Sequence, residues 1–252
     1  MPWFRRARAE VPADWEAVLE RRVAHWRWLD ADEQARLGEL LAQIVRGKRW
    51  EAANGFELTD EMRVVIAAQA ALLVLELGYD AYDDVGTIIV HPSTMHVHQV
   101  SAGDVAGTEV AGVVHLLGEA QYGGPVVVAW DSASRAARHP DRGHDVVLHE
   151  FAHKLDMLDT VVDGTPPLVD DAQRERWIHV SGHEYQRLRD GDGAPVLDPY
   201  GATDPGEFFA VATEAFFTVP IELRADCPDL YEAYAAFYRQ DPAERLVRHH
   251  AT

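Results

Sequence analysis

The residues best suited to catalytic chemistry in this sequence form an H-E-x-x-H pentapeptide, His149-Glu150-Phe151-Ala152-His153. If the segment is helical, residues four positions apart lie on one face, so both imidazoles can reach a single metal ion. Glu150 then lies beside the first histidine, where its carboxylate can take a proton from metal-bound water. Two imidazoles, one oxygen ligand and one water are the usual hydrolytic arrangement of zinc, so the pattern predicts one Zn²⁺ per chain.

The residues around the motif predict that its helix is buried. Apolar side chains occur on nearly every side of it, namely Val146, Val147, Leu148, Phe151, Ala152 and Leu155. Burying two imidazoles and a carboxylate without partners would cost several kcal/mol, and a metal ion removes that cost by binding the neutral imidazoles. The alternative is a half-exposed helix whose polar face holds these residues by chance.

The pentapeptide supplies two ligands, and a third must come from elsewhere in the chain. In metzincins a glycine and a histidine follow the motif, but Asp156 and Asp159 occupy those positions here, which excludes a third histidine of that kind. Glu207 and Glu214, seven residues apart on one face of a predicted helix, are the remaining candidates. Glu207 also fits a capping-box position after Asp204, and Glu214 could equally be an ion-pair partner, so spacing leaves both open.

The periodicity of apolar residues predicts the elements that must position these groups. Helical spacing covers residues 15–29, 32–45, 60–77, 145–158, 171–189, 205–218 and 229–239. Short β-rich segments occupy residues 87–90, 112–117 and 126–130. Asp30 and Thr59 are the predicted caps of the second and third helices. We expect an α+β fold, mostly helical, with one small mixed β-sheet.

The predicted elements form a single domain that covers residues 1–252. Its three parts are an N-terminal helical part at about 1–80, a sheet with the active-site helix at about 85–160, and a C-terminal helical part at about 168–248. The loops between predicted helices are too short to be interdomain linkers.

The composition excludes several classes of protein. The 252 residues include 23 Lys and Arg against 42 Asp and Glu, a formal net charge of −19, which disfavours direct binding to nucleic acid or to an anionic membrane surface. Cys227 is the only cysteine, so no intramolecular disulfide, Cys-based zinc site or iron–sulfur cluster can form. The N-terminus lacks the apolar core of a signal peptide, and the longest apolar stretch, 64–77, is too short to span a bilayer. We expect a cytoplasmic protein.

Ordered blocks of the sequence resemble one known family. The blocks are residues 55–58 (GFEL), 75–78 (LELG), 124–130 (GPVVVAW), 149–156 (HEFAHKLD), 200–211 (YGATDPGEFFAV) and 237–242 (FYRQDP). They resemble the MtfA-type zinc peptidases, which are named after a factor that titrates the glucose repressor Mlc. The catalytic core of that family is similar to that of anthrax lethal factor. The resemblance extends over nearly the whole chain and implies a zincin-like metallopeptidase domain.

The resemblance implies a complete set of site residues. In that family the two motif histidines and the glutamate after Asp-Pro-x bind zinc, and these positions are His149, His153 and Glu207 here. Glu150 matches the general base. A tyrosine seven residues before the ligand glutamate hydrogen-bonds the oxyanion of the tetrahedral intermediate, and Tyr200 occupies that place.

Two further groups are predicted around the metal. Gly118, Glu119 and Ala120 are expected in an edge strand that pairs with an extended peptide substrate. The aromatic residue that the family would place next is replaced by Gln121, which affects side-chain preference rather than the chemistry. Asp156 is expected to orient a metal-binding histidine by accepting a hydrogen bond.

These features predict a zinc-dependent, gluzincin-like peptidase, and the resemblance implies aminopeptidase-type action on short peptides. The alternative hypothesis is a regulatory binding protein that sequesters a transcriptional repressor of the Mlc type, with zinc catalysis secondary. The acidic surface would suit the basic DNA-binding face of such a partner. The intact Glu150 favours the enzyme, because a structural zinc site is closed by four ligands and needs no base.

Overall fold

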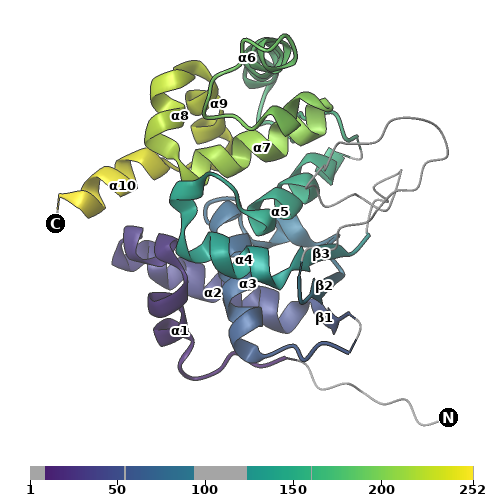
Figure 1. The fold of residues 1–252 in the computed structure, drawn as a ribbon, viewed down its shortest axis with the longest axis vertical. Helices are drawn as coiled ribbons and strands as arrows, with labels where there is room; N and C mark the ends of the chain where they lie inside the picture. The colour runs from purple at the N-terminus through teal and green to yellow at the C-terminus, as the bar shows by residue number, and fades with distance from the viewer. Residues whose placement is uncertain (1–8, 54, 94–123, 160, 252) are drawn as a thin grey trace, which may run out of the picture.

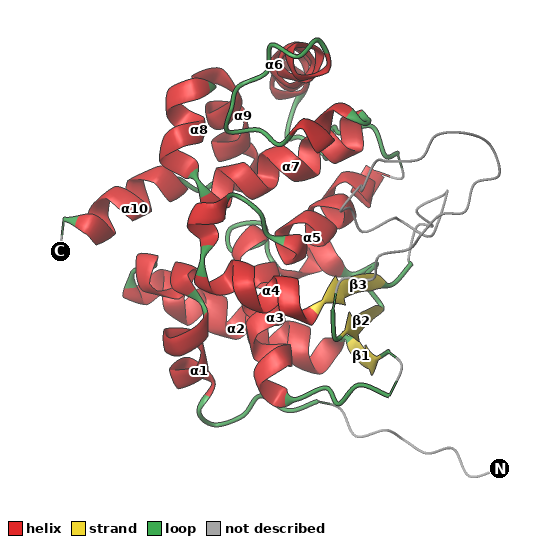
Figure 2. Ribbon diagram, in the orientation of Figure 1, coloured by secondary structure: helices red, strands yellow, loops and turns green. Residues whose placement is uncertain are grey.

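Helices form most of the chain and pack against one small sheet (Figures 1 and 2). The computed structural model describes residues 9–53, 55–93, 124–159 and 161–251. The helices are α1 (Trp15–Arg22), α2 (Ala31–Gly47), α3 (Asp60–Leu73), α4 (Trp130–Arg138), α5 (Val146–Asp156), α6 (Asp171–Arg189), α7 (Pro205–Thr218), α8 (Pro220–Asp226), α9 (Pro228–Tyr238) and α10 (Pro242–His250). The predicted, mostly helical α+β class is confirmed.

The sheet contains three described strands, all parallel. They are β1 (Arg49–Ala52), β2 (Thr87–His91) and β3 (Val126–Ala129), in the order β1-β2-β3. In register, Trp50 pairs with Ile88, which pairs with Val126. The sequence did not predict β1. The predicted strand at 112–117, which would have made the sheet mixed, lies outside the described residues.

Side-chain caps fix where the N-terminal helices begin. Asp30 accepts hydrogen bonds from the amides of Asp32 and Glu33, and Glu33 in return accepts one from the Asp30 amide, which completes a capping box before α2. Thr59 accepts from the Met62 amide at the start of α3. Both predicted caps are confirmed. The predicted helix 15–29 divides at Val23 into α1 and a 3₁₀ helix, η1 (Ala24–Trp28), because Val23 is extended.

Proline starts each of the last four helices of the described chain. Pro205, Pro220, Pro228 and Pro242 occupy the first helical positions of α7, α8, α9 and α10. The first amide of a helix has no partner within the helix, and the fixed φ of proline already suits the helix, so proline is favoured there. Each of these helices therefore begins without an unpaired backbone amide at its first position.

Helix α5, which carries the H-E-x-x-H motif, crosses the middle of the molecule (Figure 1). It packs against α7 on one side and against α3, α4 and β3 on the other. Leu148, Phe151 and Leu155 are fully buried in these contacts. The predicted burial of this helix is confirmed, and the half-exposed alternative is wrong.

One continuous hydrophobic cluster joins the N-terminal helices, the sheet and the C-terminal helices. In the C-terminal half it is rich in aromatic rings, with Trp177 stacked on Tyr234 at a centroid distance of 4.7 Å. Gln240 crosses to the N-terminal half, where its side-chain amide donates to the Leu72 carbonyl at 2.9 Å. Within the described ranges no helix combines the length and the hydropathy that crossing a bilayer requires.

Candidate metal centre

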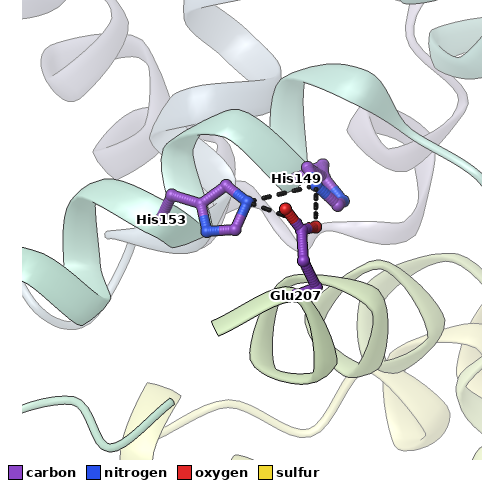
Figure 3. A group of neighbouring side chains, drawn as sticks. All are labelled: His149, His153 and Glu207. Carbon is purple, nitrogen blue, oxygen red and sulfur yellow. Dashed lines mark hydrogen bonds and ion pairs between the residues drawn. The ribbon is translucent and has the colours of Figure 1, made fainter. Parts of the chain in front are cut away.

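Two imidazole nitrogens and one carboxylate oxygen converge between α5 and α7 (Figure 3). Nε2 of His149 and Nε2 of His153 lie 3.2 Å apart. Oε2 of Glu207 lies 3.1 Å from the first nitrogen and 3.6 Å from the second. The side chains of all three residues are almost entirely buried, with 12% or less exposed. The structure therefore brings together the two predicted histidines and one of the two candidate glutamates.

The separations of these three atoms fit a single tetrahedral ion. Zinc binds imidazole nitrogen and carboxylate oxygen at about 2.0–2.2 Å, so two ligand atoms of a tetrahedral site lie about 3.3–3.5 Å from each other. The three observed separations, 3.1, 3.2 and 3.6 Å, bracket this value. The donor set, two imidazoles and one carboxylate, is also one that zinc accepts in hydrolytic sites.

The local structure of two helices places these ligands. Asp145 caps α5 by accepting from the amides of Val147 and Leu148, so the helix begins three residues before His149. Helical geometry then puts His149 and His153 on one face. At α7, Asp204 accepts from the Glu207 amide at 2.9 Å. The predicted cap at Asp204 forms, and the Glu207 side chain extends from the first turn toward the imidazoles.

Glu214 holds the other nitrogen of the His149 ring. Its Oε1 lies 2.7 Å from Nδ1 of His149, and its Oε2 accepts the Asp145 amide at 2.5 Å. One buried carboxylate thus links the ring to the start of its own helix. A proton held on Nδ1 leaves the lone pair of Nε2 facing the convergence point, which is the tautomer that a metal ion requires. The sequence left Glu214 open as a metal ligand or as an ion-pair partner, and its contact with Nδ1 of His149 is that of an ion-pair partner.

Tyr200 lies at the edge of the same site. It belongs to a 3₁₀ helix, η5 (Pro199–Ala202), whose cap Asp198 accepts the Tyr200 amide at 2.8 Å. Its ring centroid is 6.3 Å from that of His149, and its hydroxyl is hydrogen-bonded to Glu207. Burial raises the pKa of Tyr200 to about 12, and the charge of Glu207 adds to the effect. The hydroxyl is therefore a protonated donor at neutral pH.

Sequence comparison identifies the protein family of this chain. The model of a family described as glucose-regulated metallo-peptidase M90 matches residues 2–239. This chain belongs to that family. Membership in the M90 metallopeptidases implies a metal ion, and His149, His153 and Glu207 offer a possible site for it.

Relatives of this M90 protein match over most of their length. The Synechocystis protein slr2042 is 35% identical over 235 residues, which cover 92% of this chain and 86% of the relative. Mlc titration factor A of Serratia proteamaculans is 35% identical over 253 residues, 98% of this chain and 95% of the relative. Mlc titration factor A of Salmonella typhi is 33% identical over 248 residues, 92% of each chain. The resemblance to the MtfA-type family is confirmed.

The electrostatics of the M90 site favour a cation at His149. Burial lowers the pKa of this imidazole, but the hydrogen bonds to Glu207 and Glu214 outweigh burial and raise the pKa to about 10. Burial and the charge of Glu214 raise the pKa of Asp145 to about 7. The Glu207 carboxylate, which favours a proton at Nε2 of the metal-free imidazole, attracts a divalent ion to the same place.

Glu150, the predicted base of this M90 protein, is half-buried next to His149. Its charge contributes to the raised pKa of Tyr200. Burial lowers the pKa of Lys154, and the charge of Glu150 partly opposes that shift. Lys154 donates to the Gly124 carbonyl at 3.0 Å, just before β3. The motif helix is therefore tied to the sheet beside the predicted base.

The remaining predicted residues are less directly connected to the centre. Asp156 is buried at the end of α5, and its Oδ2 accepts the Gly164 amide at 3.1 Å. The proposed substrate strand, Gly118, Glu119 and Ala120, lies outside the described residues. The link from Asp145 through Glu214 to His149 was not predicted, since sequence spacing cannot show which nitrogen of a ring a carboxylate will meet.

Proposed function

We propose that this M90 protein is a zinc-dependent peptidase in which His149, His153 and Glu207 hold the metal. The observation that carries the proposal is the convergence of two imidazole nitrogens and one carboxylate oxygen at separations of 3.1–3.6 Å. Three protein ligands leave a tetrahedral ion one position for water, as hydrolytic zinc sites require.

Three further polar side chains around the site, those of Glu150, Tyr200 and Glu214, have a part in peptide hydrolysis. When bound, zinc polarises the scissile carbonyl and lowers the pKa of the attacking water. Glu150 takes the proton of that water and returns it to the leaving amine. Tyr200, whose hydroxyl is protonated at neutral pH, donates a hydrogen bond to the developing oxyanion. Glu214 keeps Nε2 of His149 directed at the metal.

The substrate class in this proposal is short peptides, from which N-terminal residues are removed. The MtfA-type resemblance supports this aminopeptidase-type action, with Gly118, Glu119 and Ala120 pairing with the peptide backbone. We place the reaction in the cytoplasm, which suits a chain whose one cysteine, Cys227, is free and buried.

Cleavage of a mixed peptide library, read by mass spectrometry, tests the proposal. Zinc-loaded wild-type protein and a Glu150→Gln variant are compared, with the zinc content of each measured. We expect cleavage by the wild type and none by the variant, although both hold one zinc per chain. Loss of single N-terminal residues would establish aminopeptidase action, and internal cuts would contradict it. A wild type that holds zinc and cuts nothing would contradict the peptidase.

A second candidate function is capture of a transcriptional repressor of the Mlc type. Two of the relatives described above carry the name Mlc titration factor A, and the chain has a formal net charge of −19. An acidic protein is attracted to the basic face with which a repressor binds DNA. In this case zinc catalysis is secondary.

A pull-down with a purified Mlc-type repressor separates the two functions. Wild type and a His149→Ala variant are immobilised in equal amounts and washed at two salt concentrations. Equal recovery of the repressor by both proteins would support a binding role that is independent of the metal. No recovery by either protein would contradict the repressor hypothesis and leave the peptidase unaffected.

A further inference from the structure

Asp156 is a buried carboxylate with no part in the chemistry proposed above. It is the last residue of α5, three residues after His153, and it is 0% exposed. Acidic side chains are almost never fully buried unless their oxygens have partners. The main partner here is a backbone amide of the loop that follows α5, the N–H of Gly164, at 3.1 Å from Oδ2.

Gly164 is held on three sides. Its amide donates to Asp156, and its carbonyl accepts from the indole N–H of Trp177 at 2.8 Å. Its φ of +73° lies in the left-handed region, and a Cβ at this position would lie 2.3 Å from the Pro205 carbonyl oxygen. Only glycine fits, because the loop lies directly against the first turn of α7.

The Asp156 carboxylate also lies beside the first turn of α7. A Cβ on Gly206 would lie 3.4 Å from Oδ2 of Asp156 and 3.1 Å from a methyl group of Val162. Gly206 directly precedes Glu207 in the sequence. Asp156, Gly164 and the Pro205–Gly206 backbone therefore form one packed unit between the helix that carries His153 and the third candidate ligand, Glu207.

We propose that Asp156, acting through Gly164, is a positioning residue that fixes the first turn of α7 against α5 and so sets the distance of Glu207 from the two imidazoles. The inference rests on the proposed metal site. Glu207 lies in the first turn, where no preceding turn supports the backbone, so the Asp204 cap and lateral contacts together hold it. The ligands of a metal site must stay within about 0.5 Å of the coordinating geometry, and contacts from surrounding residues keep them there.

Metal affinity, rather than activity alone, tests this role. We would measure zinc dissociation constants by competition with a chelator, the absorption spectrum of the Co²⁺-substituted protein, and the Tm of the metal-free protein. Asp156→Ala and Gly164→Ala should weaken zinc binding by about 10- to 100-fold and change the Co²⁺ spectrum. Asp156→Asn keeps an acceptor oxygen for the Gly164 amide, and it should bind zinc within a few-fold of the wild type.

Gly191→Ala is the matched control. Gly191 has a φ of +83°, close to that of Gly164, but no atom lies within 4 Å of the position of its Cβ. Both alanine variants therefore suffer backbone strain, whereas only Gly164→Ala also displaces the start of α7. We expect the control to lower the Tm and leave zinc affinity unchanged.

Trp177→Phe provides a milder variant if Asp156→Ala or Gly164→Ala fails to fold. It keeps a ring in the aromatic cluster but removes the indole donor to the Gly164 carbonyl. It should weaken zinc binding several-fold. If these variants lower the Tm but keep wild-type zinc affinity and Co²⁺ spectrum, Asp156 is merely structural and the inference is wrong. A wild type that binds no zinc would contradict the proposed function as well.

Discussion

At the scale of single residues, Glu207 and Glu214 contact opposite nitrogens of one imidazole. Oε2 of Glu207 lies 3.1 Å from Nε2 of His149, and Oε1 of Glu214 lies 2.7 Å from Nδ1. The two glutamates are seven residues apart and share a face of α7. The tertiary structure gives them different roles, because the first turn of α7 lies at one edge of the imidazole and the third turn lies at the other. The sequence could therefore name both residues but could not assign them by spacing.

Glu214→Gln should weaken zinc binding by about 10- to 100-fold. The carboxylate accepts from two N–H groups at once, the imidazole of His149 and the backbone of Asp145. Glutamine has one acceptor oxygen, so one of these donors would face an NH₂ group and the ring would lose its fixed orientation. The measurement is the zinc dissociation constant by competition with a chelator.

The matched control for this variant is Glu184→Gln. Glu184 is also a glutamate with little exposure, 12%, but it pairs with Arg187 on α6. Its replacement should leave zinc affinity unchanged. If Glu214→Gln binds zinc as tightly as the wild type, the orienting role of Glu214 is wrong.

Tyr200→Phe should lower kcat by about 10²- to 10³-fold, the effect of removing one oxyanion donor. KM should change much less, because the hydroxyl contributes to the transition state more than to the bound peptide. Steady-state kinetics on a short peptide cut by the wild type gives both constants. A change confined to KM would contradict the oxyanion role and indicate that Tyr200 only helps to bind the substrate.

At the scale of elements, capping side chains correctly predict where three of the helices begin. Asp30, Thr59 and Asp204 each cap the helix that they were expected to cap. Helix α4 has no such signal, since it starts directly after β3 at Ala129 without a side-chain cap. Strand β1 has only four residues, and its single polar–apolar alternation, Arg-Trp-Glu-Ala, is too short to indicate a strand, so the pairing with β2 is what identifies it.

His25 lies in η1 and joins this short element to α7. Its Nε2 lies 3.0 Å from the Phe217 carbonyl oxygen, and it is 3% exposed. Burial lowers its pKa from 6.5 to about 4, although the Phe217 hydrogen bond opposes the shift, and the charge of Arg245 adds to it. The folded-state pKa lies below that of the unfolded chain, so the unfolded state takes up the proton first as the pH falls. Protonation of His25 in the unfolded state therefore lowers the free energy of unfolding progressively as the pH falls from 6.5 to about 4.

His25→Gln should remove this pH dependence while keeping a donor for the Phe217 carbonyl. Between pH 7.5 and pH 5 the wild type should lose about 2 kcal/mol of unfolding free energy relative to the variant. Asp145 and Asp156, whose pKa values are raised by burial, change stability in the opposite direction, but both proteins contain them and their effect cancels. Urea titrations at the two pH values measure the difference.

The exposed His183 supplies the control for this comparison. Its side chain is 63% exposed, so His183→Gln should follow the wild type at both pH values. Equal pH dependence in the wild type and His25→Gln would show that the burial of His25 does not affect the acid stability of the protein.

At the scale of the whole molecule, the C-terminal helix returns to the N-terminal helices. Arg245 of α10 contacts Glu33 of α2 at 2.7 Å through both Nε and a terminal nitrogen, and it donates to Gln240 at 2.8 Å. The side chains of Arg245 and Glu33 are only 6% and 13% exposed. The two residues are 212 positions apart, so no local pattern in the sequence could have paired them.

Glu33→Gln should lower the unfolding free energy by about 3 kcal/mol, because it leaves the guanidinium of Arg245 buried without a counter-charge. Glutamine still accepts from the Asp30 amide, so the capping box is retained and the loss reports the ion pair. Glu61→Gln is the matched control: its pair with Arg22 has side chains 31% and 34% exposed, and its loss should cost less than about 1 kcal/mol. Chemical denaturation of the three proteins measures both effects. Equal stability of the two variants would mean that α10 is held by its apolar contacts alone.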